Sequence, residues 1–595
     1  MTGPSPASGA GRDQRLPLLA IILQSALLPL LGVPIWFRNE APYHYLYCRE
    51  IGLLDSWKTY TPAINRPVVR FVEWVECQAF GANASLYVLF NGLLFVLFTI
   101  VLARLAASLF GRVAGWLTVL ALLATSSLVF YPIYNAIHGV EYPLELLLAT
   151  GAVALLHAAL RGDARRFAAG VACGLLAVFT HSMSLAVLPA VLVAAVALAP
   201  ERPALFGPRG RLAILVLAPC ALLLMPLVQS SGAPGGILAQ GGPAGSIRFA
   251  LAQAAALDAQ AMRAPFGTIF LWGALFLAMG GAAARPAGSR APVGGGAPDA
   301  VAPPGAGGRS GAVPPPGAAG RPNAVAPRRM LLLAALALAA AVAVSLVGPS
   351  VRCARLALLL AALAAAAARD RRLAFLVTWA FAGAGLFLLT PERNASYYRH
   401  LAVPAAVLLG GAFAGMLEAT GRALPLAPAL RRAITLPRAA LAAALLSAAV
   451  LVAARAVPVP ILSARIADID YVKDLSFAFR DLVAHVAREA APGDTILMYR
   501  GPTREEESRE LYGTSYMERL QPSKFPYYEW YFRLLGREDI RVAAVEDRAT
   551  DPERLRGRRL LAVNAWEIER TIVERGVRPE AEFRRGRARA AIFAP

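Results

Sequence analysis

Charged residues are scarce in this chain: Asp, Glu, Lys and Arg make up 16% of its 595 residues, whereas hydrophobic residues make up 57%. Ordinary soluble domains carry about 25% charged residues, so this chain has too few polar side chains to cover a water-exposed surface of its size. The mean hydropathy is +0.53, and long apolar runs alternate with short arginine-rich gaps. These features predict a multi-span membrane protein and exclude a cytosolic enzyme, a secreted disulfide scaffold and a fibrous protein.

Cysteine is also rare, with five residues and no CxxC pair, so no zinc or redox motif is present. Cys48 and Cys77 are the pair that could face an oxidising compartment together, and a disulfide between them is the less favoured of the two expectations. The first apolar run lacks a small-residue cleavage site and therefore predicts a retained span, not a removed signal peptide. The sequence shows no repeat of 20–50 residues and no nucleotide-binding fingerprint.

The net charge is +21, from 59 Lys and Arg against 38 Asp and Glu. A basic balance can indicate nucleic-acid binding, but here the basic residues sit in loops between apolar spans, so no nucleic-acid partner is expected. If the N-terminus lies inside, the inner loops contain roughly twice as many basic residues as the outer loops, which is the usual bias of membrane proteins. This orientation predicts a plasma (inner) membrane protein with a cytoplasmic N-terminus and an extracytoplasmic tail.

The apolar runs predict an all-α polytopic membrane protein with about 13 transmembrane helices. The expected spans are 17–37, 86–107, 114–131, 142–160, 167–181, 183–199, 212–228, 265–283, 330–348, 355–368, 373–389, 401–418 and 439–456.

Four other segments complete the expected domain organisation. Residues 1–16 form a cytoplasmic tail, and 38–85 form a long outer loop rich in aromatic and charged residues. Residues 284–329 are rich in Pro, Gly, Ala and Arg without periodicity, which predicts a disordered cytoplasmic linker. Residues 457–595 predict a small extracytoplasmic α/β domain, with a helix near 471–490, strands near 495–499, 541–545 and 559–563, and a helix near 566–576.

Ionisable side chains gather at the outer ends of the spans. Glu40 follows the first span beside Trp36 and Phe37, where a carboxylate at the membrane boundary can act as a general base. A solvated loop acid is the alternative for Glu40 taken alone. Arg66, before Pro67, could bind a phosphate with two hydrogen bonds, or could simply be a surface residue before a helix.

Two further segments carry candidates. The stretch from His138 to Leu144 opens the fourth span, and its Glu141 would face the same side as Glu40, although an acid at a helix N-terminus can also be purely stabilising. Arg399 follows Tyr398 at the start of a late span, which suits an anionic lipid headgroup or an interfacial anchor. His181 lies at a similar level and, taken alone, favours a structural role.

At these residues the sequence resembles the GT-C membrane glycosyltransferases, the superfamily of protein O-mannosyltransferases and lipid A aminoarabinose transferases. The matching segments follow the family's order. They are Asn39–Tyr43, Arg66–Pro67 through Phe80–Gly81, Leu89–Gly111, Glu141–Leu144, Gly174–Leu175, Thr180–His181, Leu188–Pro189 and Arg399–Pro404.

Two residues depart from the family pattern. The family's first Asp is Asn39 here, and the Lys after Thr180 is His181. Since an amide cannot act as a base, either Glu40 or Glu141 has taken that role, or activity is lost.

The resemblance implies a GT-C-like fold, with jaw-like helices in the first outer loop, and an inverting transfer of sugar from a polyprenyl phosphate to a glycan, lipid or protein hydroxyl. It implies membrane lipid, the donor lipid and the acceptor as partners, with no metal and no cofactor. The implied roles are as follows: Glu40 and Glu141 catalytic; Arg66, His181 and Arg399 binding the donor phosphate; Asn39, Tyr43, His138 and Tyr398 binding acceptor or sugar.

Two other functions stay open from the residues alone. One is a lipid-linked-glycan flippase or other transporter, although such folds usually show internal repeats and broken helices. The other is a non-catalytic relative or scaffold, which the amide of Asn39 would fit and in which the C-terminal domain would carry the binding.

Overall fold

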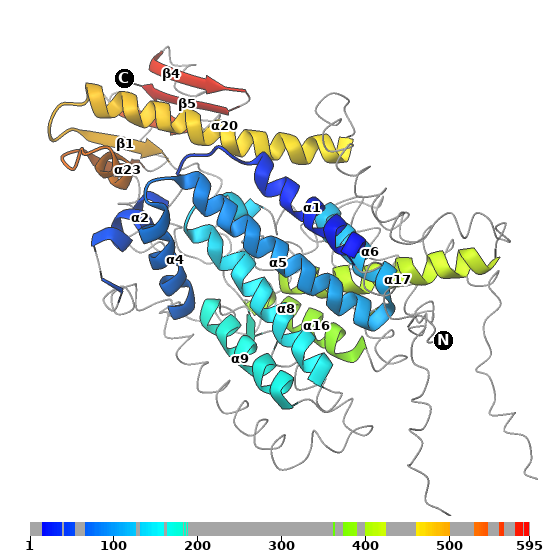
Figure 1. Cartoon of the computed structure of the whole chain (residues 1–595). Coiled ribbons are helices and arrows are strands. Elements are labelled where there is room, and N and C mark those ends of the chain that lie inside the picture. Colours follow the sequence, from blue (N-terminus) through cyan, green and yellow to red (C-terminus); the bar gives the residue numbers. More distant parts are fainter. Residues whose placement is uncertain are drawn as a thin grey trace, which may run out of the picture.

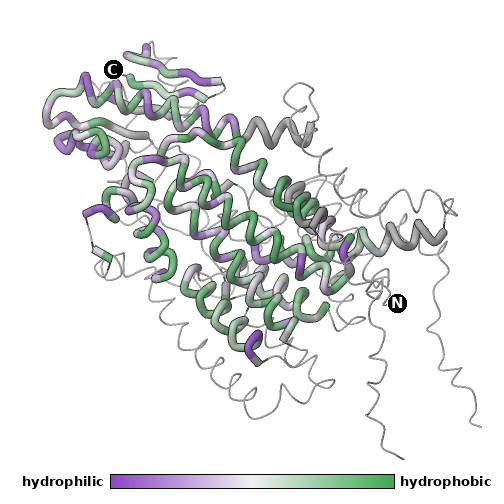
Figure 2. The backbone as a smooth tube through the Cα atoms, in the orientation of Figure 1, coloured by the Kyte–Doolittle hydropathy of each residue, from purple (hydrophilic) through white to green (hydrophobic). Residues whose placement is uncertain are grey.

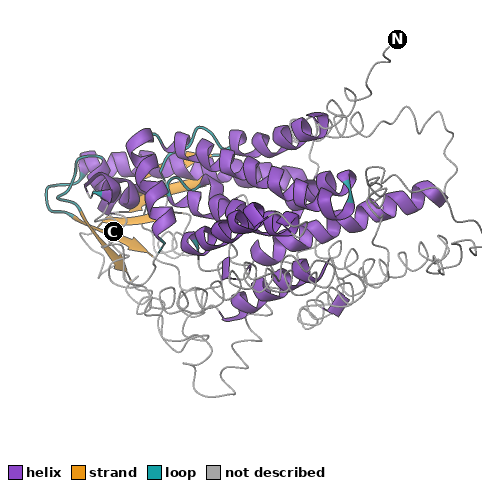
Figure 3. Cartoon of the chain, turned by 60° about the horizontal axis from the view of Figure 1, so that its bottom comes forward, coloured by secondary structure: helices purple, strands orange, loops and turns teal. Residues whose placement is uncertain are grey.

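The structure is a computed structural model of the whole chain in which helices predominate and a small sheet lies at one end (Figures 1 and 3). The residues that the structure describes are 15–37, 41–50, 52–53, 66–125, 131–159, 164–181, 184–185, 187, 361–362, 373–389, 399–423, 460–499, 529–545, 559–563, 578–586 and 588–593.

Seven of the described helices occupy predicted spans. They are α1 (Arg15–Leu31), α5 (Ala84–Phe110), α6 (Arg112–Thr125), α8 (Glu141–Ala159), α9 (Ala164–Thr180), α16 (Ala374–Leu389) and α17 (Arg399–Ala423). The predicted spans 183–199, 212–228, 265–283, 330–348, 355–368 and 439–456 lie wholly or mostly outside the described residues, as do the predicted linker 284–329 and the predicted helix 566–576.

Helix α5 is the centre of this bundle and packs against α1, α6 and α8. It begins where the side chain of Asn83 accepts a hydrogen bond from the backbone N–H of Ser85 at 3.2 Å, and it ends at Gly111, whose φ of 93° favours glycine. Among the described residues, α5 is the one helix that is both long and apolar enough to cross a membrane, and the shorter apolar helices lie in α1, α6 and α17.

One face of α5 is an exposed stripe of large apolar side chains, formed by Leu86, Leu89, Leu93 and Leu97. These residues recur every three or four positions, the spacing that places side chains on one face of a helix. The opposite face carries Phe95 and Phe98, which are fully buried. Figure 2 shows hydrophobic residues along the bundle helices and a mixture of hydrophilic and hydrophobic residues on the C-terminal elements. A contiguous exposed leucine stripe fits a surface that meets lipid.

Small residues allow the helices of the bundle to approach closely. A Cβ atom at Gly410 of α17 would meet the side chain of Thr118 and, at 2.8 Å, the backbone oxygen of Ala114, both on α6. Close helix packing at small residues is the usual basis of helix association in membranes, where lipid tails are as apolar as leucine.

The predicted outer loop 38–85 folds in part into two helices, α2 (Ala41–Glu50) and α4 (Pro67–Phe80), which pack against each other. Pro67 fits the first position of α4, where a missing N–H costs no hydrogen bond. In α4 the charged side chains of Arg70, Glu73 and Glu76 are buried, whereas Phe71 and Val75 are exposed. Cys48 of α2 and Cys77 of α4 are both buried and free, so the structure contains no disulfide between them.

The C-terminal segment forms α20 (Pro460–Glu489), α23 (Glu529–Leu534) and a five-stranded sheet of order β2-β1-β3-β5-β4. Strands β1 (Thr495–Tyr499), β2 (Arg541–Val545) and β3 (Arg559–Val563) are parallel and match the predicted strands. Strands β4 (Pro579–Arg585) and β5 (Ala588–Phe593), which the sequence analysis missed, form an antiparallel hairpin beside β3. Helix α20 packs against this hairpin (Figure 1).

Aromatic contacts attach this segment to the end of the bundle. The ring of Trp36, just after α1, lies 5.3 Å from Tyr531 of α23 and 6.4 Å from Phe479 of α20. The backbone N–H of Trp36 also donates to the hydroxyl of Ser476 at 3.3 Å. The α/β segment therefore covers the same end of the bundle that α2 and α4 cover.

Candidate active site

A buried network of charged side chains lies where α4, α8, α9 and α17 meet. Its acidic members are Glu141 and Glu145, both on α8 and both fully buried. The two positions are one helical turn apart, so both carboxylates lie on one face of the helix. Isolated charges in an apolar bundle are costly, which means that partners must accompany them.

Glu141 is the first residue of α8 and pairs with Arg66, the N-cap residue of α4. The same carboxylate oxygen lies 3.0 Å from Nε2 of His181. The N-terminal position on α8 adds the favourable field of the helix dipole for a carboxylate. The structure therefore brings Arg66, Glu141 and His181 together.

Glu145 has a separate set of partners. Its Oε2 pairs with the guanidinium of Arg399 at the start of α17, and its Oε1 lies 2.7 Å from Nε2 of His400. The hydroxyl of Ser184 donates to the same Oε1 at 2.8 Å. Arg399 also lies over the ring of Tyr142, 4.6 Å from its centroid.

His181 joins the two halves of the network. It directly follows α9, and its backbone N–H donates to the carbonyl of Ala177 at 2.9 Å, which fixes it at the helix end. Its Nδ1 lies 3.7 Å from Oε1 of Glu145, and its Nε2 faces Glu141. One imidazole ring thus lies between both carboxylates.

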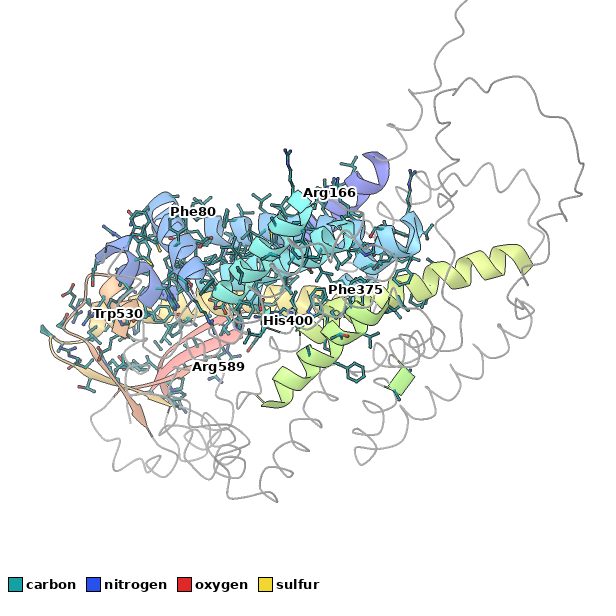
Figure 4. All side chains as sticks on the ribbon, turned by 90° about the horizontal axis from the view of Figure 1, so that it is seen from below. Phe80, Arg166, Phe375, His400, Trp530 and Arg589 are labelled. Atoms are coloured by element: carbon teal, nitrogen blue, oxygen red, sulfur yellow. The ribbon has the colours of Figure 1, made fainter. Side chains whose placement is uncertain are left out.

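The network is closed on most sides. The side chains of Glu141, Glu145, His181, Arg399 and His400 are at most 2% exposed, whereas that of Arg66 is 11% exposed. Figure 4 shows His400 among the packed side chains of the interior and Arg166 on the outside. Arg66 is therefore the member of this network nearest to the surface.

The other predicted site residues are placed differently. Tyr43 lies on α2, where its ring is 5.4 Å from His44 and 5.1 Å from Trp530 of α23, so it belongs to the contact between α2 and the C-terminal segment. His138 lies in the 3₁₀ turn η3 (His138–Val140) that leads into α8, but its side chain is outside the described part of the structure. Asn39, Glu40 and Tyr398 are likewise outside the described residues.

Sequence reasoning missed Glu145, His400 and Ser184 as members of the network. The signal for Glu145 was present, because a second acid four residues after Glu141 in an apolar run is costly unless it is paired. His400 was noted in the stretch that opens the late span, but nothing local distinguished it from an interfacial residue.

A second buried polar group joins α2 to α4. Arg70 pairs with Glu73 and lies 3.2 Å from Nδ1 of His44. Burial, the neighbouring Glu73 carboxylate and Cys48 raise the pKa of Glu76 well above its usual value. Glu76 therefore favours its neutral form, and Arg70 contacts both Glu73 and His44. We infer that this polar cluster holds α2 and α4 together.

No family model matches the chain, and no curated protein matches it. Two crystal structures of ArnT from Cupriavidus metallidurans are similar in arrangement. The form bound to undecaprenyl phosphate is 14% identical with a TM-score of 0.31, and the apo form is 13% identical with a TM-score of 0.34. In both cases the match covers 99% of this chain and 99% of that chain.

ArnT is a lipid A aminoarabinose transferase, one of the groups that the sequence resembles.

Proposed function

We propose that this protein is a membrane glycosyltransferase that moves a sugar from a polyprenyl-phosphate donor to a hydroxyl acceptor on the outer face of the membrane, and that the network around Glu141 is its reaction site. One observation carries the proposal: two carboxylates, two guanidiniums and two imidazoles converge in the interior of an apolar helix bundle. Buried ion pairs add little stability compared with apolar packing, so their retention favours a chemical role.

The proposed surroundings are an inner membrane that the chain crosses many times, with the N-terminus cytoplasmic and the α/β segment outside. The leucine stripe on α5 supports contact with lipid, because exposed apolar stripes of this length are unfavourable in water. A polyprenyl chain could then reach the bundle laterally and bring its phosphate to the end that α2, α4 and the α/β segment cover.

The reaction requires a base and a group that stabilises the leaving phosphate. The acceptor hydroxyl gives its proton to a carboxylate, Glu141 or Glu40, while its oxygen bonds to the anomeric carbon. The bond between that carbon and the phosphate oxygen breaks, and its electron pair leaves with the phosphate. Attack opposite the leaving group inverts the anomeric centre, and base assistance of this kind is typically worth about 10²–10⁴-fold in rate.

Arg66, His181 and Arg399 are the proposed phosphate-binding residues, since donors placed where negative charge develops stabilise the transition state. Arg66 is the most exposed of the network, so an arriving phosphate would meet its guanidinium first. The phosphate would then compete with Glu141 for Arg66, and the released carboxylate would be able to accept a proton. Asn39, Tyr43, His138 and Tyr398 remain proposed contacts of acceptor or sugar, and the lipid-linked donor is a substrate, not a cofactor.

The test uses cells that contain one variant as their only copy of this protein. Mass spectrometry then compares the envelope glycolipids and glycans of these cells with those of the wild type. Glu141→Gln should remove the product or reduce it at least about 100-fold. The double variant Arg66→Gln with Glu141→Gln keeps the charge balance and should be equally inactive while folding normally. Glu50→Gln, an exposed acid at the end of α2, is the matched control and should leave the product unchanged.

Equal product from the wild type and from the double variant would contradict the proposal. The network would then be a structural polar core. Transport of labelled lipid without glycosyl transfer would instead support the flippase alternative.

A further inference from the structure

The indole of Trp379 on α16 fixes the hydrogen-bonding state of His400. Its Nε1–H donates to Nδ1 of His400 at 3.0 Å, and both side chains are fully buried. An indole nitrogen is only a donor. Nδ1 of His400 must therefore act as an acceptor without a proton, which places the single ring proton on Nε2.

The proton on Nε2 points to Glu145. Nε2 lies 2.7 Å from Oε1 of Glu145, so His400 donates and the carboxylate accepts. Ser184 donates to the same oxygen at 2.8 Å, and Arg399 holds the other oxygen. A carboxyl group that accepts from three neighbours is stabilised in its ionised form and in one orientation.

A glycine makes this arrangement possible. Gly383 lies one helical turn after Trp379 on α16, and a Cβ atom there would lie 2.7 Å from the backbone carbon of His400 and 2.9 Å from its Cβ. Helices α16 and α17 can therefore approach closely enough for the indole of Trp379 to reach the imidazole of His400.

The carboxylate that His400 orients faces the ring joining the two halves of the network. Oε1 of Glu145 lies 3.7 Å from Nδ1 of His181, whose Nε2 is 3.0 Å from Glu141. His181 therefore lies between the two carboxylates, and the carboxylate of Glu145 that faces it also contacts His400, which accepts from Trp379.

We propose that Trp379 and His400 are positioning residues, which hold Glu145 as an oriented carboxylate so that Glu145 directs His181 toward Glu141. Both are fully buried, and they are proposed to act through Glu145 and not by touching substrate. The assignment of the His400 tautomer stands on the geometry alone, and its consequence for transfer rests on the proposed function.

The direct test is ¹⁵N NMR of the full-length protein in lipid nanodiscs, labelled at the ring nitrogens of its six histidines. Protonated and unprotonated ring nitrogens differ widely in ¹⁵N shift. The signal that disappears in His400→Gln should be that of a neutral ring protonated at Nε2. Trp379→Phe keeps an aromatic ring but removes the donor, so the His400 signal should change to a mixture of ring states.

Trp116→Phe is the matched control, because the indole N–H of Trp116 is buried without a hydrogen-bond partner in the described part of the chain. It should leave the His400 signal unchanged. The His181 signal is the one that disappears in His181→Gln. It should shift in His400→Leu, because leucine cannot donate to Glu145, and it should not shift in Trp116→Phe. A wild-type His400 protonated at Nδ1, or a Trp379→Phe spectrum identical to that of the wild type, would overturn the proposal.

A second readout uses the glycan products. Trp379→Phe should reduce product formation by about 10-fold to 100-fold, the loss typical when support of a reacting group is removed. His400→Gln, whose amide can still donate to Glu145, should retain more activity than His400→Leu. If the NMR result holds but Trp379→Phe forms product at the wild-type rate, the positioning role is wrong. If even the wild type forms no glycosyl product, the proposed function fails while the NMR result stands.

Discussion

Glu141 and Glu145 lie one turn apart on α8, and a different arginine holds each carboxylate. Arg66, 75 residues before Glu141, pairs with the first, and Arg399, 254 residues after Glu145, pairs with the second. Residues at the starts of α4 and α17, which are distant in sequence, thus bring their charges to one face of α8. We regard this separate pairing as the feature that keeps two like charges together in an apolar interior.

The Arg399–Glu145 pair should be strongly coupled in stability. Arg399→Met leaves a buried carboxylate without its guanidinium, which typically costs about 3–5 kcal/mol. Combining Arg399→Met with Glu145→Gln should recover a large part of that loss, because the uncompensated charge is removed. Thermal unfolding of the three variants in detergent measures the coupling, and strictly additive losses would show that the two side chains do not interact.

The exposed face of α5 should not tolerate charge at mid-helix. Leu97 lies near the centre of the helix and is 42% exposed, so Leu97→Arg would place a cation among lipid tails at a cost of about 2.5–3.5 kcal/mol. The yield of membrane-inserted protein should fall. Ser108→Arg, exposed on the same helix near its end, is the control and should insert normally because its side chain can reach the interface. Normal insertion of Leu97→Arg would mean that this face does not contact lipid.

The α/β segment should contain an acid-sensitive contact. Arg537 binds Asp539 and also donates to the carbonyl of Ala490 at 3.0 Å, at the end of α20. The Arg537 guanidinium, and to a smaller extent the backbone N–H of Gly493, hold the pKa of Asp539 below its usual value of 3.8. The contact therefore stabilises the fold at neutral pH, above the unfolded-state pKa, and this contribution is lost as the pH falls below about 4 through the lower folded-state pKa.

The corresponding measurement is the thermal unfolding midpoint of the full-length protein at pH 7 and pH 3. Asp539→Asn should lower the midpoint at pH 7 and have a smaller effect at pH 3. The exposed neighbour Glu538 supplies the control variant, Glu538→Gln. An equal effect of Asp539→Asn at both pH values would argue against the contact.

Hydropathy was sufficient to locate the described bundle helices, because each consists largely of an apolar run. It also singled out Glu141, His181 and Arg399, which stand at the ends of apolar runs, whereas Arg66 was singled out within the first loop by its position before Pro67. The partners of these residues could not be predicted in this way. The contact of Glu145 with His400 joins positions 255 residues apart, and only the tertiary fold, which brings the start of α17 to the first turns of α8, creates it.

The hairpin of β4 and β5 is an element that its local sequence did not predict. β4 reads PEAEFRR and β5 reads ARAAIF, and neither is a typical strand sequence. Their pairing depends on the neighbouring strand β3 and on α20, which packs against the hairpin, and Ala590 and Ile592 of β5 are buried. Tertiary packing therefore decided the structure of a segment whose local sequence was neutral.

The most direct measurement of the central claim is an experimental structure of this protein with undecaprenyl phosphate bound. The account predicts the phosphate within hydrogen-bonding distance of Arg66 and His181, at the end of the bundle beneath α4, with Glu141 no longer paired to Arg66. A phosphate bound elsewhere, with the Arg66–Glu141 pair unchanged, would contradict it.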